Sequence, residues 1–198
     1  VSFVEKMYPE YCNNLSTARS PQQMLGSLVK SFFAKKLDVK AEDIVVVSIM
    51  PCTAKKFEAK RPEFAKNGVP DVDIVLTTRE LGHLMRLKKV PLGSLPSSEY
   101  DKPLGLSTGA AVIFGASGGV MEAAVRTAYE VSVGKPLPSL DLTDFRGFSG
   151  IKQTTAELIK KNGEKVQVRL AVCNGIANAR LAIEKMKAGE AMWDFIEV

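Results

Sequence analysis

Apolar positions in the first half of the chain switch between helical and strand-like spacing. In residues 22–37 they recur every three or four residues, as in a helix, and Ser20-Pro21 precedes them as a start signal. Residues 43–50 (DIVVVSIM) form a continuous β-branched run, typical of a strand covered on both faces. Residues 73–78 (DIVLTT) repeat this run, and Thr78 is expected to cap a helix over residues 79–88.

Two further strands are predicted in the second half, at residues 165–175 (KVQVRLAVCNG) and 193–198 (WDFIEV), with a helix over 176–189 between them. Strands separated by helices favour βαβ units. The sequence therefore predicts an α/β fold, with a mainly parallel four-stranded sheet flanked by helices, in a single domain over residues 1–198. Residues 89–109 and 134–150 are rich in Pro, Gly and Ser and are interpreted as long ordered loops, the second anchored by Phe145 and Phe148.

The ends of three predicted strands are candidate ligand sites, because ligands of parallel sheets collect beyond the carboxyl ends of the strands. Cys52 follows the first strand, Thr77-Thr78 the second and Asn174-Gly175 the third.

Cys52 is the strongest of these candidates. Pro51 cannot donate to a strand ladder, so the chain should turn there and expose the thiol. If a helical turn follows, Lys55 lies over the same site, and a nearby cation favours the thiolate that attacks or binds metal. A small buried apolar cysteine fits the same pattern.

Residues 114–130 (FGASGGVMEAAVRTAYE) predict a glycine-rich turn that enters a helix. A free helix N-terminus offers N–H groups to an anion or a bulky cofactor. The glycines can equally serve close helix packing. The spacing of Gly115, Gly118 and Gly119 matches neither a Walker loop nor a GxGxxG fingerprint.

Several other polar or sulfur-containing residues have an ordinary structural interpretation. Residues 13–23 combine turn and cap chemistry before a helix, Cys12 and Cys173 are interpreted as core residues, and His83 as a helix-surface or packed histidine. The lone histidine leaves no hydrolytic triad and disfavours a zinc site.

Composition excludes several classes of function. The net charge is +5, and its basic residues form no stripe interleaved with aromatics, so no nucleic-acid partner is expected. No apolar run approaches the ~20 residues of a membrane span, and no signal peptide is evident. Three cysteines without a CxxC indicate a reducing compartment, the cytoplasm, with the periplasm left open. A start at Val1 suggests a fragment or a processed chain.

One ordered set of motifs covers nearly the whole chain: SPQQ, then MPCxxKxxE, then TTREL, then FGASGGVMEA. This set resembles the catalytic H-domain of the iron-only, or [FeFe], hydrogenases, and the chain corresponds to one lobe of that two-lobed domain. The resemblance implies reversible interconversion of protons and electrons with H2. It also implies an H-cluster, a [4Fe-4S] cubane joined to a two-iron unit with CO, cyanide and dithiolate ligands.

Site residues follow from the same resemblance. Cys52 matches a cubane ligand, Lys55 the lysine that donates to an iron-bound cyanide, and Ser16 a serine of the proton path. Glu58 matches the end of the motif, where a structural ion pair is expected. Neighbours of the two-iron unit are matched by Ser20, Gln22, Met50, Pro51, Phe114 and Gly115.

The resemblance also implies that this chain is incomplete. Its family holds the H-cluster with four cysteines from three motifs, of which TSCCPGW is expected before Val1 and MACxGGCxxGGG after Val198. The chain alone is therefore expected to be inactive, with the H-cluster incomplete or absent. Implied partners are the remainder of the hydrogenase polypeptide or subunit, iron–sulfur domains, and ferredoxin or a similar electron carrier, or an NAD-linked partner.

Two alternatives stay open. One is a hydrogenase-like iron–sulfur protein, sensory or assembly-related, without H2 turnover; retention of Lys55, Ser20 and Met50 favours the hydrogenase over it. The other is a non-enzymatic soluble α/β binding module with an adventitious strand-end cysteine.

Overall fold

The computed structural model describes residues 1–198 except 107, 137–149 and 161. Contacts within the chain divide it into two compact units, Val1–Gly105 and Leu106–Val198. Each unit is described by itself.

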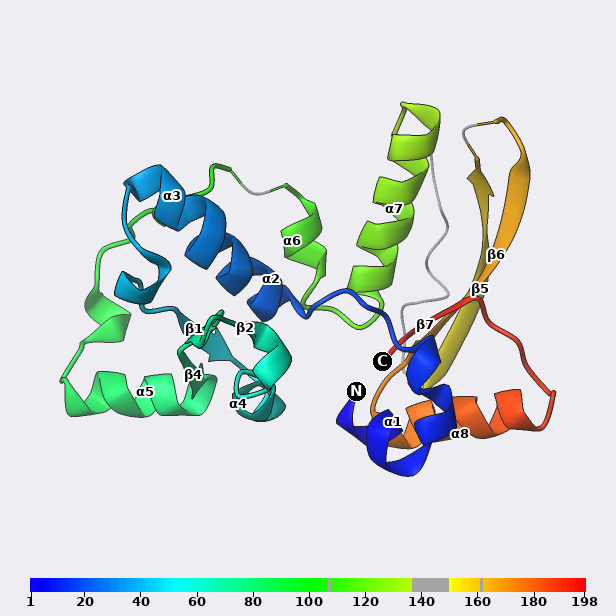
Figure 1. Ribbon diagram of the computed structural model, residues 1–198, viewed down its shortest axis with the longest axis horizontal. Coiled ribbons are helices and arrows are strands. Elements are labelled where there is room, and N and C mark those ends of the chain that lie inside the picture. The colour runs from blue at the N-terminus through cyan, green and yellow to red at the C-terminus, as the bar shows by residue number, and fades with distance from the viewer. Residues whose placement is uncertain (107, 137–149, 161) are drawn as a thin grey trace. The chain divides into compact units, whose positions relative to one another are not determined.

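The first unit contains helical segments around two small sheets (Figure 1). Its helices are α1 (Ser2–Met7), α2 (Pro21–Leu28), α3 (Ala34–Leu37), α4 (Ala54–Glu58) and α5 (Thr78–Leu87). Its strands are β1 (Val47–Met50), β2 (Ala65–Lys66), β3 (Val69–Pro70) and β4 (Ile74–Thr77). The 3-10 segments are η1 (Pro9–Asn14), η3 (Ala41–Asp43), η4 (Pro62–Phe64) and η5 (Leu92–Ser94), and η2 (Val29–Phe33) is a π-helix.

Strands β1 and β4 form a parallel pair in which Met50 lies opposite Thr77. The two strands therefore end at the same edge, which places Cys52 and Thr77-Thr78 there, as predicted. Ser48 on β1 is buried, whereas Val47 and Ile49 are each 47% exposed. The prediction of a strand covered on both faces is therefore wrong for β1, since alternate residues face opposite sides and only one side is covered.

The helix predicted over residues 22–37 forms as the continuous run α2, η2 and α3. Its buried face is not its most apolar one: Gln22 and Gln23 are buried, while Leu25 and Leu28 are exposed. Gly26 explains this orientation, because a Cβ built on it would lie 2.4 Å from the backbone oxygen of Asp71. The helix approaches the neighbouring backbone on the side where glycine leaves room.

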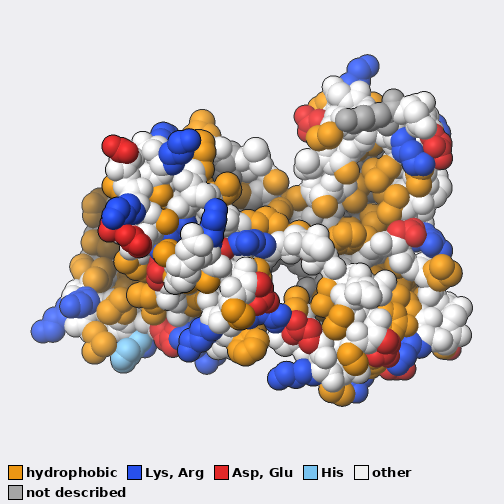
Figure 2. Space-filling view, viewed as in Figure 1, with side chains coloured by type: hydrophobic (Ala, Val, Ile, Leu, Met, Phe, Trp, Pro, Cys, Tyr) orange, Lys and Arg blue, Asp and Glu red, His pale blue; other side chains and the backbone are white. Residues whose placement is uncertain are grey.

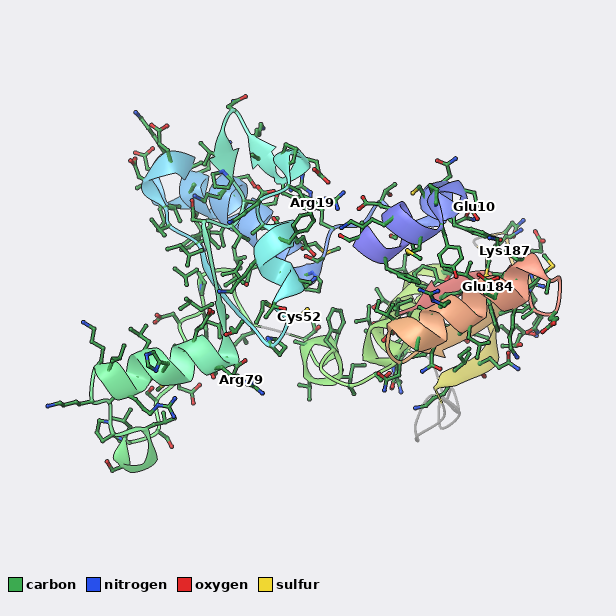
Figure 3. All side chains as sticks on the ribbon, turned by 90° about the horizontal axis from the view of Figure 1, so that it is seen from below. Glu10, Arg19, Cys52, Arg79, Glu184 and Lys187 are labelled. Atoms are coloured by element: carbon green, nitrogen blue, oxygen red, sulfur yellow. The ribbon has the colours of Figure 1, made fainter. Side chains whose placement is uncertain are left out.

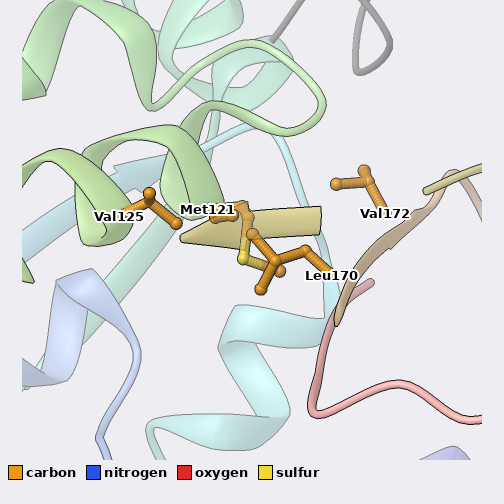
Figure 4. Packing of buried hydrophobic residues seen from close by; sticks show 5 residues of the cluster. Met121, Val125, Leu170 and Val172 are labelled. Carbon is orange, nitrogen blue, oxygen red and sulfur yellow. The ribbon is translucent and has the colours of Figure 1, made fainter. Parts of the chain in front are cut away.

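The second unit packs helix α7 (Gly119–Val133) against a three-stranded sheet. Strand β5 (Ile151–Ile159) pairs antiparallel with β6 (Lys165–Cys173), and β6 pairs parallel with β7 (Phe195–Glu197). Helix α6 (Ala110–Ile113) precedes α7, and α8 (Ile176–Lys187) connects β6 to β7. Side chains of α7, β5 and β6 form the core between helix and sheet (Figure 4): Met121, Val125, Ala156, Leu170 and Val172.

The α/β class, with parallel strands flanked by helices, is confirmed, and all four predicted strands form. The described strands do not make one four-stranded sheet, however. They divide into the pair β1–β4 in one unit and the pair β6–β7 in the other. Strand β5, which was not predicted, belongs to the second sheet. It was not predicted because its polar, threonine-containing sequence lacks a continuous apolar run.

Smaller predictions have mixed outcomes. Thr77, not Thr78, caps α5, and its hydroxyl accepts the Glu80 N–H. Residues 89–109 contain only η5 as regular structure in their described part, as a long loop should. Most of the predicted loop 134–150, including Phe145 and Phe148, lies outside the described residues. Among the residues described, no helix is both long and apolar enough to cross a bilayer. The single domain over 1–198 stays a prediction.

Candidate functional site

Cys52 lies in the turn between β1 and α4, and its side chain is exposed (Figure 3). The chain turns at Pro51, and the Lys55 N–H donates to the Cys52 carbonyl at 3.3 Å, which begins the helical turn that the sequence predicts. A buried apolar cysteine, the alternative interpretation, is therefore wrong. The structure presents the thiol at the end of a parallel strand, where a ligand can reach it.

Glu58 accepts hydrogen bonds from three side chains, one near to it in the sequence and two distant from it. The Lys55 ammonium lies 2.9 Å from one Glu58 oxygen. The Ser20 hydroxyl donates to the other oxygen, and the Gln22 amide lies 3.5 Å from it. Three predicted site residues, Ser20, Gln22 and Lys55, thus meet at one carboxylate, and the ion pair predicted for Glu58 forms with Lys55.

A buried hydroxyl fixes the Gln22 amide in this arrangement. Ser48 on β1 donates to the Gln22 carbonyl oxygen at 2.9 Å. The Gln22 NH2 group must then point the other way, where it donates to the Lys55 main-chain carbonyl at 3.2 Å. Because both Ser48 and Gln22 are buried, this connection joins β1, α2 and α4 beneath the Cys52 turn.

Electrostatics favour an ionised Glu58. Burial acts to raise the pKa of its carboxyl, but hydrogen bonds from Ser20 and Lys55 outweigh burial and hold the pKa below its ordinary value. Glu58 is therefore a charged carboxylate at neutral pH and holds the Lys55 side chain. A lysine side chain held in this way can donate to an anionic ligand.

Lys56, the next residue, makes a different ion pair. Its ammonium lies 2.7 Å from Glu80, which also completes the capping box of α5 with Thr77. The charges of Glu80 and Lys56 therefore hold α4 to the start of α5, and the pKa of Glu80 falls to about 2 under the hydrogen bonds from Lys56 and Thr77. Consecutive lysines thus have separate partners, and only Lys55 shares the Glu58 cluster.

Arg19 secures the segment that leads into α2. Its guanidinium pairs with Asp71 and lies 5.4 Å from the centroid of the Phe64 ring. Arg19 is therefore a structural anchor next to Ser20, on the side of the first unit that also carries the Cys52 turn (Figure 3).

Phe114 and Gly115 lie in an exposed turn between α6 and α7. The close packing predicted for the glycines is confirmed at Gly119, where a Cβ would lie 1.7 Å from the Ile113 carbonyl oxygen, but not at Gly115, where a Cβ would meet nothing within 4 Å. The prediction of a free N-terminus for this helix is wrong. The carboxylate of Glu197 accepts the N–H groups of Gly118 and Met121 at 2.8 and 2.7 Å.

The remaining predicted residues lie outside the Glu58 cluster. Ser16 is exposed, and its hydroxyl oxygen accepts the Ala18 N–H at 3.1 Å. Cys173 is 1% exposed, as predicted, and burial raises the pKa of its thiol. Cys12 is only half-buried, which corrects its assignment to the core, because its short 3-10 segment carries no buried residue. His83 lies on the exposed surface of α5, as predicted.

Cys52 is the metal ligand that the sequence predicts. Within the described ranges, no three His, Cys, Asp or Glu side chains gather in a way that could hold a metal ion. A single exposed thiol fits one ligand of a thiolate-bound cluster whose other ligands come from elsewhere. Ser48 and Glu197 were missed by sequence reasoning, because only the folded chain brings them to their partners.

The chain matches the family described as iron only hydrogenase large subunit, C-terminal domain, over residues 1–198. It is 47% identical over 190 residues to the NADP-reducing hydrogenase subunit HndD of Solidesulfovibrio fructosivorans, covering 96% of this chain and 32% of that one. The cytosolic iron-sulfur assembly component 3 of Pongo abelii is 32% identical over 207 residues, covering 100% of this chain and 42% of that protein.

Among solved structures, an apo form of the [FeFe]-hydrogenase HydA1 from Chlamydomonas reinhardtii superimposes with a TM-score of 0.82 at 40% identity. That match covers 100% of this chain and 55% of the solved one. The chain thus spans between a third and just over half of the length of the proteins it matches. With the family matched from end to end, the chain belongs to the iron-only hydrogenase large-subunit family.

Proposed function

We propose that this chain is a part of an iron-only hydrogenase that interconverts protons and electrons with H2 at an H-cluster, and that the chain alone is inactive. The observation that carries the proposal is the exposed Cys52 thiol at the end of β1, followed in the sequence by a Lys55 ammonium held by Glu58. Family membership supports it.

The proposed roles follow the chemistry of each group. Cys52 supplies one thiolate to the cubane, and Lys55 donates to an anionic cyanide. The H-cluster, when bound, supplies the redox chemistry. The residues proposed to line the two-iron unit are Ser20, Gln22, Met50, Pro51, Phe114 and Gly115, and Ser16 is proposed for the proton path.

Ser20 and Gln22 support Lys55 indirectly as well. Both donate to Glu58, and Gln22 also binds the Lys55 carbonyl, so they fix the backbone and the counter-ion of the lysine. This arrangement holds the Lys55 side chain in one place, as a preorganised donor requires.

An assembly-related iron–sulfur protein is the second candidate, because one relative is named a cytosolic iron-sulfur assembly component. Its identity of 32% is lower than the 47% shared with a hydrogenase subunit, so hydrogenase activity is preferred. The proposed partners are the remainder of the hydrogenase polypeptide and a ferredoxin-like or nicotinamide-linked electron carrier, in the cytoplasm.

Lys55→Asn in the intact protein tests the proposal, with Lys56→Asn as the matched control. In Lys55→Asn, the intensity of the CO and cyanide infrared bands and the rate of H2 evolution should both fall by about tenfold or more. The reason is that a hydrogen bond to a charged group is worth ~1.5–3 kcal/mol. Lys55→Asn should keep the iron of the cubane. Cys52→Ala should lose cubane iron as well.

Lys56→Asn should keep both bands and activity, because Lys56 pairs with Glu80. Unchanged H2 evolution in Lys55→Asn would overturn the role of Lys55. Cubane iron in the wild-type protein without CO or cyanide bands would favour the assembly-related candidate instead.

A further inference from the structure

Helix α7 begins without a side-chain cap of its own. Its N-cap residue is Gly118, at a φ of 86°, which has no side chain to accept the N–H groups of the first turn. A helix of 15 residues with open N–H groups at this end carries a partial positive charge there. An acceptor from elsewhere in the chain must therefore satisfy this end.

Glu197 supplies that acceptor from strand β7. One carboxylate oxygen accepts the Gly118 N–H at 2.8 Å, and the other accepts the Met121 N–H at 2.7 Å. In an ordinary capping box, the N-cap and N3 side chains make these two bonds. Here one carboxylate, 76 residues beyond Met121 in the sequence, makes both.

Strand pairing holds Glu197 in place for this task. Glu197 lies opposite Val172 in the parallel ladder of β6 and β7. Phe195, two residues earlier and on the same side of the strand, lines an apolar cavity with Met121 of α7. The side of β7 that carries Phe195 and Glu197 thus faces α7, which makes the Glu197 contact part of helix–sheet packing.

The capped turn also determines the path of Phe114 and Gly115. Residues 113–119 form a tight turn in which the Ala116 N–H binds the Ile113 carbonyl at 3.1 Å and the Gly119 N–H binds the Ala116 carbonyl at 2.9 Å. Gly119 leaves no room for a Cβ against Ile113. A turn closed internally in this way moves as one piece with the helix end that Glu197 holds.

We infer that Glu197 is a positioning residue for the turn between α6 and α7: its carboxylate holds the turn that carries Phe114 and Gly115. The inference rests on the proposed function, in which these two residues line the two-iron unit. Glu197 acts through the backbone N–H groups of Gly118 and Met121.

Glu197→Gln in the intact protein tests this inference, with Glu130→Gln at the opposite end of α7 as control. A carboxamide accepts only one of the two N–H groups and removes the charge that favours the helix N-terminus. Amide hydrogen exchange of residues 114–122 in the apo-protein should accelerate about tenfold, with β6 unchanged. The CO and cyanide infrared bands of the loaded protein should shift.

Glu130→Gln should leave exchange and bands as in the wild type. If Glu197→Gln lost protection from exchange but kept unshifted infrared bands, Glu197 would be only a structural cap of α7, which would contradict the inference. If its protection were unchanged, Glu197 would not cap α7 at all. A wild-type protein without CO or cyanide bands would overturn the proposed function, while exchange would still report on the cap. If Glu197→Gln does not fold, Glu197→Asp, which keeps the charge on a shorter side chain, should give faster exchange and shifted bands. Wild-type bands in that variant would likewise overturn the inference.

Discussion

Glu58 shows how one carboxylate can organise several functional groups. It accepts hydrogen bonds from Ser20 and Lys55, and Gln22 reaches it from a buried position fixed by Ser48. Removing its charge would leave the Lys55 ammonium without its counter-ion in a partly buried place, which costs more than losing an exposed pair.

Glu58→Gln should therefore lower the stability of the apo-protein by ~1–3 kcal/mol at pH 7. The pKa of Glu58 is lowered in the folded chain from its ordinary value of 4.5. Its charge thus stabilises the fold above that value, and this stability is lost as pH falls through the folded pKa. The difference in unfolding free energy between the wild type and Glu58→Gln, measured by chemical unfolding, should therefore be smaller at pH 4 than at pH 7.

Glu42→Gln is the control for Glu58→Gln, because Glu42 is exposed and its pair with Lys40 is long, at 3.5 Å. That variant should unfold like the wild type at both pH values. An equal gap at pH 7 and pH 4 for Glu58→Gln would contradict the assignment of its charge.

At the residue scale, sequence reasoning predicted local groups and missed distant ones. Lys55 follows Cys52 by three residues, so spacing predicted that they share a site, whereas the ion pair of Glu58 was expected from the family resemblance. Ser48 and Gln22 are 26 residues apart, and Glu197 meets Gly118 from 79 residues away. No spacing rule covers such pairs, because sheet pairing and helix packing create them.

At the scale of elements, Gly26 decides how closely α2 approaches the chain before β4. A Cβ there would lie 2.4 Å from the Asp71 oxygen and 2.8 Å from a Val72 methyl group. Gly26→Ala should therefore destabilise the apo-protein by ~1–3 kcal/mol, because backbone must shift. Chemical unfolding measures this change.

Gly82→Ala is the matched control for Gly26→Ala. Gly82 lies inside α5, and nothing comes within 4 Å of a Cβ built on it. This variant should gain ~0.5–1 kcal/mol from helix propensity. Destabilisation of equal size at both glycines would contradict the role of close packing at Gly26.

Most elements could be predicted because their apolar spacing is strong. The helices α2, α5 and α8 and the strands β1, β4, β6 and β7 were indicated by residue patterns along the chain, with start or cap signals before α2 and α5, and α7 by the glycine-rich turn that enters it. Strand β5 was missed, since the consecutive polar residues 152–155 give it neither a continuous apolar run nor a regular alternation. The cap of α5 was misplaced by one residue because Thr77 and Thr78 are both good caps, and only Glu80 at N3 of Thr77 selects the first.

At the scale of the whole molecule, Leu170 tests whether the two units unfold together. Leu170 is 2% exposed and packs with Met121 and Val125 in the core of the second unit (Figure 4). Leu170→Ala should cost ~2–5 kcal/mol. We expect amide exchange in the apo-protein to accelerate over residues 106–198 and to stay unchanged over 1–105.

Equal acceleration in both units would instead support the single domain that the sequence predicts. The division of strands between sheets could not be predicted, because period shows that a strand exists but not which strand it pairs with. Hydrophobic side chains also reach the surface over both units (Figure 2), including Val47 and Ile49 of β1, where a buried strand was expected.

The three thiols differ in solvent exposure, so their chemical modification reports on the state of the protein. Cys52 is exposed, Cys12 half-buried and Cys173 sealed in the core. An alkylating reagent thus reaches Cys52 first and Cys173 only after unfolding. A thiolate bound to iron does not alkylate. Under the proposed role of Cys52, the fraction of Cys52 that stays unmodified therefore measures cluster occupancy, readable by mass spectrometry without any assay of hydrogen.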